Sequence, residues 1–185
     1  MIMKELSLHL MDIAQNSISA GAKLVEITVD VDHAKDRMRC EVADDGRGMD
    51  ADFLKKVTDP FITSRTTRKV GLGIPFFKEA AEGCGGAFEL ESKPGVGTRI
   101  AASFQTSHID RPPLGDMADT VYGLVCANEG IDFTYTYRVD GKTFRFDTRE
   151  VRRALGGDIA LSTPEVAAWI KECLTEGTLE LNGGV

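Results

Sequence analysis

The chain has 185 residues, of which 42% are hydrophobic and 28% charged, a composition typical of a globular protein with one or two domains. Its net charge of −7 and isoelectric point near 5.0 argue against general binding to nucleic acid or to anionic membranes, because both require a basic surface. The four cysteines form no CxxC pair or Cys/His cluster, which argues against zinc and indicates buried thiols. Since no stretch is apolar enough for a signal peptide or a membrane span, we expect a cytoplasmic protein.

The first predicted element is a helix over residues 5–19. Apolar residues recur at helical spacing from Leu6 to Ile18, and Gly21 suits the end of the helix. A second stripe carries polar residues three or four positions apart, namely His9, Asp12, Asn16 and Ser19. This stripe is either a solvated helix face or one wall of a binding site.

Two alternating strands are predicted next, at 25–31 and 37–44, joined by a polar turn. The second strand leads directly from Asp44 and Asp45 into Gly46-Arg47-Gly48. Acidic glycine-rich turns are common, so this segment alone could be an ordinary turn or a ligand loop. A short helix follows it, and Asp50 is the predicted N-cap.

Residues 59–70 are polar, with Arg65, Arg68 and Lys69 between hydrophobic ends. They predict either a surface loop or a mobile lid that brings cations to phosphates. Gly71 and Gly73 then introduce a helix over about 74–83, whose N-terminus could bind phosphate. Two strands joined by KPGVG follow, and the second begins near Thr98. The spacing is neither that of a Walker P-loop nor that of a dinucleotide fingerprint.

Four motifs in this order make the chain resemble the GHKL superfamily of ATPases over about residues 5–106: the Asn16 helix, Asp44-x-Gly46-x-Gly48, Gly71-x-Gly73 after a basic lid, and Gly95-x-Gly97-Thr98. That superfamily comprises gyrase, a heat-shock chaperone, histidine kinases and mismatch-repair ATPases. The resemblance implies the Bergerat fold, an α+β two-layer sandwich in which an open mixed sheet carries helices on one face. It also implies ATP and Mg²⁺ as ligands.

The resemblance assigns roles to particular residues. Asn16 corresponds to the magnesium ligand, which suits an amide oxygen. Asp44 corresponds to the carboxylate that reads adenine, supported by Thr98, while Gly46 and Gly48 leave room for the purine. The other residues assigned to nucleotide binding are Met49 and, near the phosphates, Arg65, Arg68, Lys69, Gly71 and Gly73.

Asp12 is the candidate catalytic residue, because it lies four positions before Asn16, where hydrolysing members of the superfamily carry a glutamate. Its side chain is one methylene shorter, which argues against efficient hydrolysis. Three functions therefore stay open: phosphate transfer to, or switching of, a regulated partner protein in trans; slow ATP hydrolysis of the gyrase or mismatch-repair type; and adenine-nucleotide sensing without turnover. For His9 we expect packing or a hydrogen bond behind the metal site rather than phosphorylation, and His33 has no evident acidic partner.

A change in composition at 107–116 predicts a linker to a second domain over 117–185. We expect a small α-β-β-α-α domain, with a hairpin turn at Asp140-Gly141 and Thr163 capping the last helix. Its expected core consists of Tyr135, Tyr137, Phe144, Phe146 and Trp169. We recognise no family resemblance in this part, and we expect it to serve homodimerisation or docking of a regulated protein.

Overall fold

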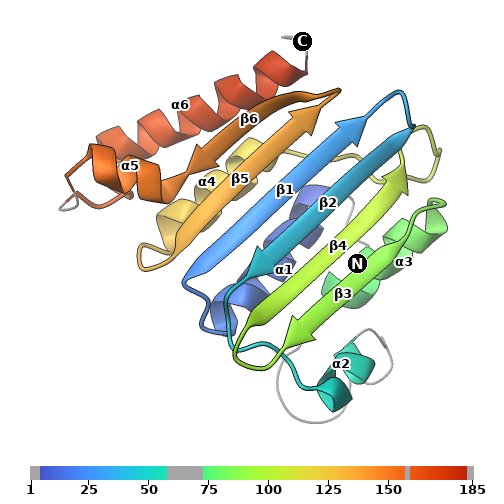
Figure 1. Cartoon of the computed structure of the whole chain (residues 1–185). Helices are drawn as coiled ribbons and strands as arrows, with labels where there is room; N and C mark the ends of the chain where they lie inside the picture. The colour runs from blue at the N-terminus through green and yellow to red at the C-terminus, as the bar shows by residue number, and fades with distance from the viewer. Residues whose placement is uncertain (1–4, 58–72, 157–158, 183–185) are drawn as a thin grey trace.

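The computed structural model describes residues 5–57, 73–156 and 159–182. They form one six-stranded mixed sheet in the order β3-β4-β2-β1-β5-β6, with α1, α3, α4 and α6 packed on one face (Figure 1). The predicted α+β architecture of an open mixed sheet with helices on one face is therefore confirmed. No described helix has the length and apolar character needed to cross a membrane.

The sheet combines antiparallel hairpins with one parallel pair. Its strands are β1 (Leu24–Asp32), β2 (Arg37–Asp44), β3 (Phe88–Lys93), β4 (Gly97–Gln105), β5 (Asp132–Val139) and β6 (Lys142–Asp147). All neighbouring strands are antiparallel except β1 and β5, which pair in parallel from Leu24 with Asp132 to Val31 with Val139. Apolar residues of β2 alternate with charged ones because one face of the strand is buried and the other is open.

Six helices are described: α1 (Leu6–Ser19), α2 (Ala51–Val57), α3 (Gly73–Gly83), α4 (Met117–Ala127), α5 (Thr148–Ala154) and α6 (Pro164–Leu181). The predicted burial of α1 is confirmed, since Leu6, Leu10 and Ile13 are at most 1% exposed. Gly21 adopts a φ of +78° just after the helix, which glycine accommodates without strain. Asp50 caps α2 by accepting a hydrogen bond from the Phe53 backbone N–H at 2.8 Å.

The C-terminal segment does not form a sheet of its own. Its predicted order of elements is observed, but β5 joins the free side of β1, so that β5 and β6 continue the sheet of the N-terminal segment. One core cluster includes residues of both segments. The predicted linker also packs on α1, where the backbone N–H groups of Leu6 and Ser7 donate to the carbonyls of Pro113 and Leu114. The sequence prediction missed this because strand patterns do not reveal which strand pairs with which.

Three smaller expectations from the sequence are wrong. Trp169 is 51% exposed, because the buried face of α6 is formed by Ala167, Ile170, Leu174 and Gly177 instead. Thr163 makes no side-chain capping hydrogen bond. His33 does have an acidic partner, because its Nδ1 lies 2.8 Å from Asp140 Oδ2 in the neighbouring turn. Of the other predicted core aromatics, Tyr135, Tyr137 and Phe146 are buried and Phe144 is half-buried.

Candidate functional site

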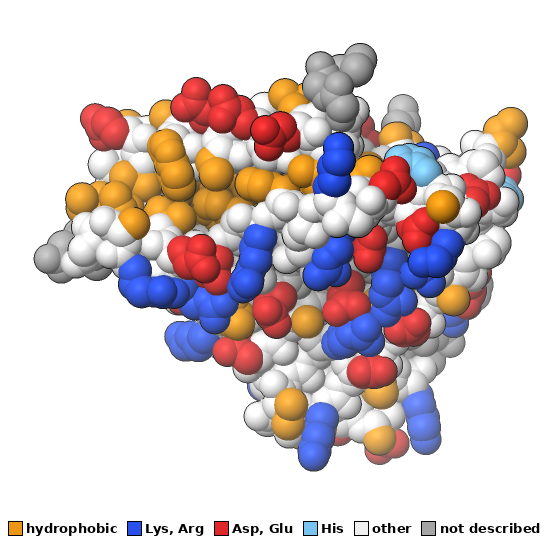
Figure 2. Space-filling model, turned by 45° about the horizontal axis from the view of Figure 1, so that its top comes forward, with side chains coloured by type: hydrophobic (Ala, Val, Ile, Leu, Met, Phe, Trp, Pro, Cys, Tyr) orange, Lys and Arg blue, Asp and Glu red, His pale blue; other side chains and the backbone are white. Residues whose placement is uncertain are grey.

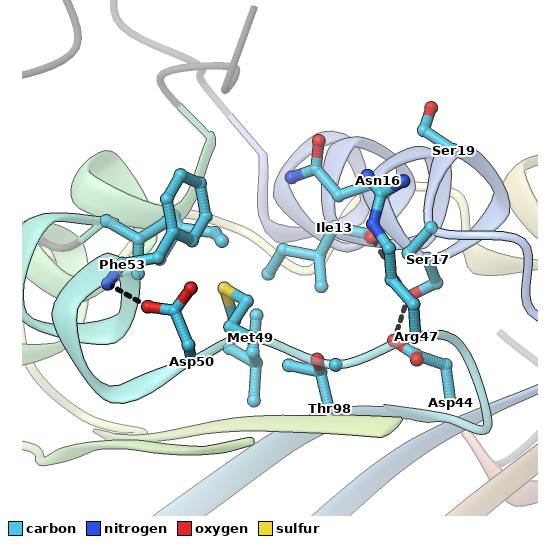
Figure 3. A pocket seen from close by; sticks show the side chains of 15 residues that line it. Ile13, Asn16, Ser17, Ser19, Asp44, Arg47, Met49, Asp50, Phe53 and Thr98 are labelled. Carbon is cyan, nitrogen blue, oxygen red and sulfur yellow. Dashed lines mark hydrogen bonds between the residues drawn. The ribbon is translucent and has the colours of Figure 1, made fainter. Parts of the chain in front are cut away.

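A cavity of about 360 Å³ lies between α1, the segment after β2, α2 and β4. Its size falls within the usual range for small-molecule sites. Figure 3 shows that its side chains come from both the helix layer and the sheet. Its lining residues are Ile13, Asn16, Ser17, Ser19, Ala20, Asp44, Arg47, Gly48, Met49, Asp50, Phe53, Val57, Ile74, Thr98 and Ile100.

Asp44 is held rigidly at the wall of this cavity. It stands at the end of β2, and its Oδ2 accepts a hydrogen bond of 2.6 Å from the hydroxyl of Ser17 on α1 (Figure 3). Its Oδ1 accepts one of 2.9 Å from the backbone N–H of Gly46. A carboxylate oxygen can accept two hydrogen bonds, so each oxygen keeps the capacity to accept one from a ligand. Asp44 is therefore a fixed acceptor beside an apolar space.

The adjacent carboxylate has a different task. Asp45 Oδ1 accepts hydrogen bonds from the backbone N–H groups of Lys23 and Leu24, at 2.7 and 2.9 Å. It is exposed and does not line the cavity. Asp45 therefore fixes the entry into β1, whereas Asp44 faces the cavity.

Thr98 is positioned opposite Asp44 by the register between β2 and β4. Its hydroxyl lies 2.8 Å from the Ser92 hydroxyl, which also accepts the backbone N–H of Met49 at 2.8 Å. One hydroxyl pair on β3 and β4 thus positions both Thr98 and Met49 in the cavity wall.

The glycines here make room for other atoms of the protein itself, and the expected room for a purine beside Gly46 and Gly48 stays a prediction. Gly48 has a φ of +66°, and a Cβ at this position would overlap the carbonyl oxygen of Lys93. At Gly46 a Cβ would lie 2.9 Å from Asp44 Oδ1. At Gly97, whose φ is +135°, it would overlap the carbonyl of Asp44. The two glycine-rich turns therefore pack directly against each other.

Asn16 and Asp12, on the same face of α1, lie in different surroundings. Asn16 lines the cavity, and its Nδ2 is buried without a hydrogen-bond partner in the described part of the chain. Asp12 is not a lining residue. It lies against the first residue of α3, where a Cβ on Gly73 would come within 2.8 Å of Asp12 Cβ. Gly73 is thus required for the packing of α3 on Asp12.

His9 lies one turn before Asp12 on α1 and is 2% exposed. Its ring packs 5.7 Å from the ring of Phe77. Burial lowers the pKa of His9, while the backbone of Gly73 and the charge of Asp12 partly oppose that shift. This packing agrees with the expected role and favours the neutral imidazole.

The structure brings five of the predicted site residues to one cavity: Asn16, Asp44, Gly48, Met49 and Thr98. Gly46, Gly73 and Asp12 lie next to it or behind it. Arg65, Arg68, Lys69 and Gly71 lie outside the described residues. The described residues contain no cluster of three His, Cys, Asp or Glu side chains that could hold a metal ion.

Several cavity residues were missed by sequence reasoning. Ser17, which holds Asp44, follows Asn16 directly, and Arg47 stands between two assigned glycines. A polar residue next to a site residue was the available signal in both cases. The apolar wall of Ile13, Phe53, Val57, Ile74 and Ile100 had no such signal, because these residues are indistinguishable in sequence from core residues.

The fold is that of the ATPase domains of the GHKL class. The family model described as "Histidine kinase-, DNA gyrase B-, and HSP90-like ATPase" matches residues 3–108. The chain belongs to this family.

Its similarity to individual proteins is distant and partial. The sensor protein DegM of Bacillus sp. (strain B21-2) is 31% identical over 94 residues, which are 51% of this chain and 25% of DegM. The sensor histidine kinase DcuS of Escherichia coli (strain K12) is 31% identical over 75 residues, which are 40% of this chain and 14% of DcuS. The chain thus spans a quarter or less of these relatives.

A solved structure extends the likeness in fold. The N-terminal domain of a DNA repair protein is similar with a TM-score of 0.54 and 17% identity, over 78% of this chain and 52% of that one. That share of the chain exceeds the region matched by the family model. The similarity in fold therefore continues into the C-terminal segment.

Proposed function

We propose that this protein binds Mg-ATP in the Asp44 cavity and uses it to transfer phosphate to, or to switch, a partner protein in trans. The observation that carries the proposal is the Asp44 carboxylate, which is fixed by Ser17 and Gly46 at the wall of a largely apolar cavity. The membership in an ATPase family supports the same ligand.

Adenine suits this combination. Its exocyclic amine can donate to Asp44, while its flat apolar faces would contact side chains such as Met49, Ile74 and Ile100. A hydrogen bond to a charged acceptor contributes about 1.5–3 kcal/mol. A purine that carries a hydrogen-bond acceptor in place of this amine would offer no donor to the Asp44 carboxylate and would bind weakly.

Mg²⁺ would be held by Asn16 together with phosphate oxygens and water, since this hard cation prefers oxygen ligands. Asn16 fits this role because it lines the cavity and its side chain offers an amide oxygen as a ligand. When bound, the ion would neutralise phosphate charge. Among the described lining residues Arg47 alone is cationic, and we assign it a contact with the phosphates.

A second candidate function is slow ATP hydrolysis with Asp12 as the base that activates water. Asp12 lies on the same helix face as Asn16, one turn away, which favours it. Its place against Gly73 rather than in the cavity wall disfavours it. A third candidate is a nucleotide sensor without turnover.

Calorimetric titration with Mg-ATP tests the binding. Asp44→Asn should weaken ATP binding by at least about tenfold, because it replaces a charged acceptor by an amide that also offers a donor to Ser17 and Gly46. Asp45→Asn is the matched control, since it changes the neighbouring carboxylate outside the cavity. Equal affinity of wild type and Asp44→Asn would refute the proposed site.

Incubation with γ-labelled Mg-ATP, alone and with a lysate of the host organism, separates the three functions. A labelled second protein supports transfer in trans, and free phosphate that is lost in Asp12→Asn supports hydrolysis. Binding without either product leaves the sensor.

A further inference from the structure

An apolar stripe runs along the C-terminal edge of the sheet, between α6 and β6. We define it by Val166, Trp169 and Cys173 of α6, Phe144 of β6, and Leu155 and Ile159 after α5. Trp169 is 51% and Ile159 44% exposed, and the other four are partly buried. Figure 2 shows hydrophobic side chains gathered there in a continuous band. Exposed hydrophobic patches of this kind mark interaction surfaces.

The position of α6 explains the stripe. On one flank of the helix, Lys171 pairs with Asp119 of α4 at 3.0 Å and lies over the ring of Tyr122. On the buried face of the helix, Gly177 lies so close to Phe144 of β6 that a Cβ on Gly177 would overlap the phenyl ring. Val166, Trp169 and Cys173 are spaced by three and four residues and therefore share the other flank, which faces away from α4.

Charges of opposite sign border the stripe on its two sides. Figure 2 shows acidic side chains above it, along α6, and mainly basic side chains below it, along the outer strand and α5. The exposed acids of α6 are Glu165, Glu172, Glu176 and Glu180. The exposed or half-buried bases of β6 and α5 on which the argument rests are Lys142, Arg145, Arg149 and Arg153.

Most of these charges are not neutralised within the protomer. Within the described ranges, the four glutamates, Lys142 and Arg153 take part in no ion pair, while Arg145 and Arg149 share the single carboxylate of Asp147. Glu150 of α5 offsets only one of the four positive charges. The stripe thus has an acidic border and a basic border, each with a net charge.

We propose that the stripe is the interface of a homodimer, with a second copy of this chain as its occupant. A two-fold axis that runs along the stripe, in the plane of the interface, places the acidic border of one protomer opposite the basic border of the other. It also places the two Trp169 rings in the same apolar layer. A two-fold interface must be complementary to itself, and this pattern of acid, apolar band and base satisfies that condition.

The oligomeric state of the 185-residue chain tests the proposal. We expect sedimentation velocity between 1 and 100 μM to show a dimer. Trp169 is the only tryptophan, so its fluorescence emission should shift to shorter wavelength as the dimer forms. Trp169→Glu should weaken dimerisation by about tenfold or more, since buried aromatic anchors dominate interface energies. Ile109→Glu is the matched control, because Ile109 is 94% exposed and lies outside the stripe.

Charge reversal provides a test that depends on the two-fold geometry. Glu172→Lys with Glu176→Lys should weaken the dimer, and so should Lys142→Glu with Arg153→Glu. The four changes together should restore it at least in part, because each border again meets the opposite sign. Circular dichroism checks that each variant is folded. The four substituted side chains are exposed in the protomer, so the changes should not disturb its core.

Three results would overturn the proposal: a monomer at all these concentrations, a dimer unaffected by Trp169→Glu and by either charge reversal, or a combined variant that dimerises no better than the two reversals. A monomer that captures a different protein through the stripe would also overturn it. Mg-ATP affinity, measured on the same samples, reports separately on the Asp44 cavity.

Discussion

Asp44 and Asp45 show how much neighbouring residues can differ in role. They are chemically identical and adjacent, but the strand alternation turns one toward the helices and the cavity and the other toward the start of β1. Asp45 completes the hydrogen bonding of backbone N–H groups, whereas Asp44 keeps acceptor capacity on the cavity side. The difference depends on the strand end and on Ser17, not on the side chain itself.

Arg47 gives the first prediction. If its guanidinium contacts the phosphates, Arg47→Ala should weaken ATP binding by about tenfold and leave adenosine binding unchanged, because only ATP carries the charge. Calorimetry with both ligands measures this. Equal losses for ATP and adenosine would show instead that Arg47 shapes the adenine end of the cavity.

At the residue scale the sequence predicted the polar members of the site better than the apolar ones. Asn16, Asp44 and Thr98 come from three distant segments and meet in one cavity as expected. Phe53 and Ile74 were not predicted, because an apolar residue gives no sign of whether it faces a ligand or the core. A glycine motif also does not reveal which atoms of the protein approach the missing Cβ, as the carbonyl of Lys93 does at Gly48.

The turns and helices carry predictions of their own, beginning with two glycines. Gly48→Ala should lower the free energy of unfolding by about 2 kcal/mol or more, because alanine meets both a positive φ and the carbonyl of Lys93. Gly123→Ala, in the exposed middle of α4 with open space around it, should raise it by about 0.5–1 kcal/mol. Urea denaturation compares the two. A Gly48→Ala variant as stable as the wild type would contradict the packing described for the glycine turns.

A pH-dependent contribution is expected at the start of α5. Asp147 caps this helix through the N–H of Arg149, and its carboxylate also accepts from the Arg149 guanidinium at 2.8 Å. The hydrogen bond with Arg149 holds the pKa of Asp147 below its ordinary value, although burial opposes the shift. Because the unfolded chain then binds the proton more tightly, this stabilisation is complete above the unfolded pKa of about 4 and is lost as the pH falls through the folded pKa.

Asp147→Asn should therefore lower the free energy of unfolding by about 1 kcal/mol at pH 7, since asparagine keeps the cap but loses the charge. The difference from wild type should shrink as the pH falls below about 4. Urea titrations at several pH values measure it. Asp116→Asn is the control, because Asp116 caps α4 without an arginine partner in the described part of the chain. A gap that is constant with pH would argue against the charge interaction.

At the scale of elements, helical spacing and strand alternation predicted nearly every segment, and the hairpin turn lies at Asp140-Gly141 as expected. Trp169 shows the limit of such reasoning. A large aromatic residue is usually buried, but the face of α6 that meets the sheet is set by the row Ala167, Ile170 and Leu174.

In the whole molecule, the parallel pairing of β1 with β5 decides whether the chain is one folding unit. A fragment of residues 1–116 would leave β1 as an edge strand and would lack α4 and α6, whose residues belong to the shared core. We expect it to aggregate or to unfold without cooperativity, unlike the full chain. Size-exclusion chromatography and thermal denaturation test this, and a cooperatively folded fragment would support the two-domain division expected from the sequence.

The sequence could not predict this pairing, because β1 has two edges and its residue pattern is the same whichever strand occupies them. Pro112, Pro113 and Gly115 mark a break in secondary structure, which predicts a domain boundary. In the structure the same residues form a short connection along α1. A composition change thus located the connection correctly but could not show that the sheet continues beyond it.

The same pairing has a consequence for the nascent polypeptide. The partner of β1 is translated about a hundred residues later, which at 5–20 residues per second means a delay on the order of 5–20 s on the ribosome. During that interval the backbone N–H and C=O groups on this edge of β1 have no permanent partner, and another unfinished strand or a chaperone could occupy it. Synthesis of β5, rather than of the ATPase motifs, is therefore the step after which β1 can be paired on both of its edges.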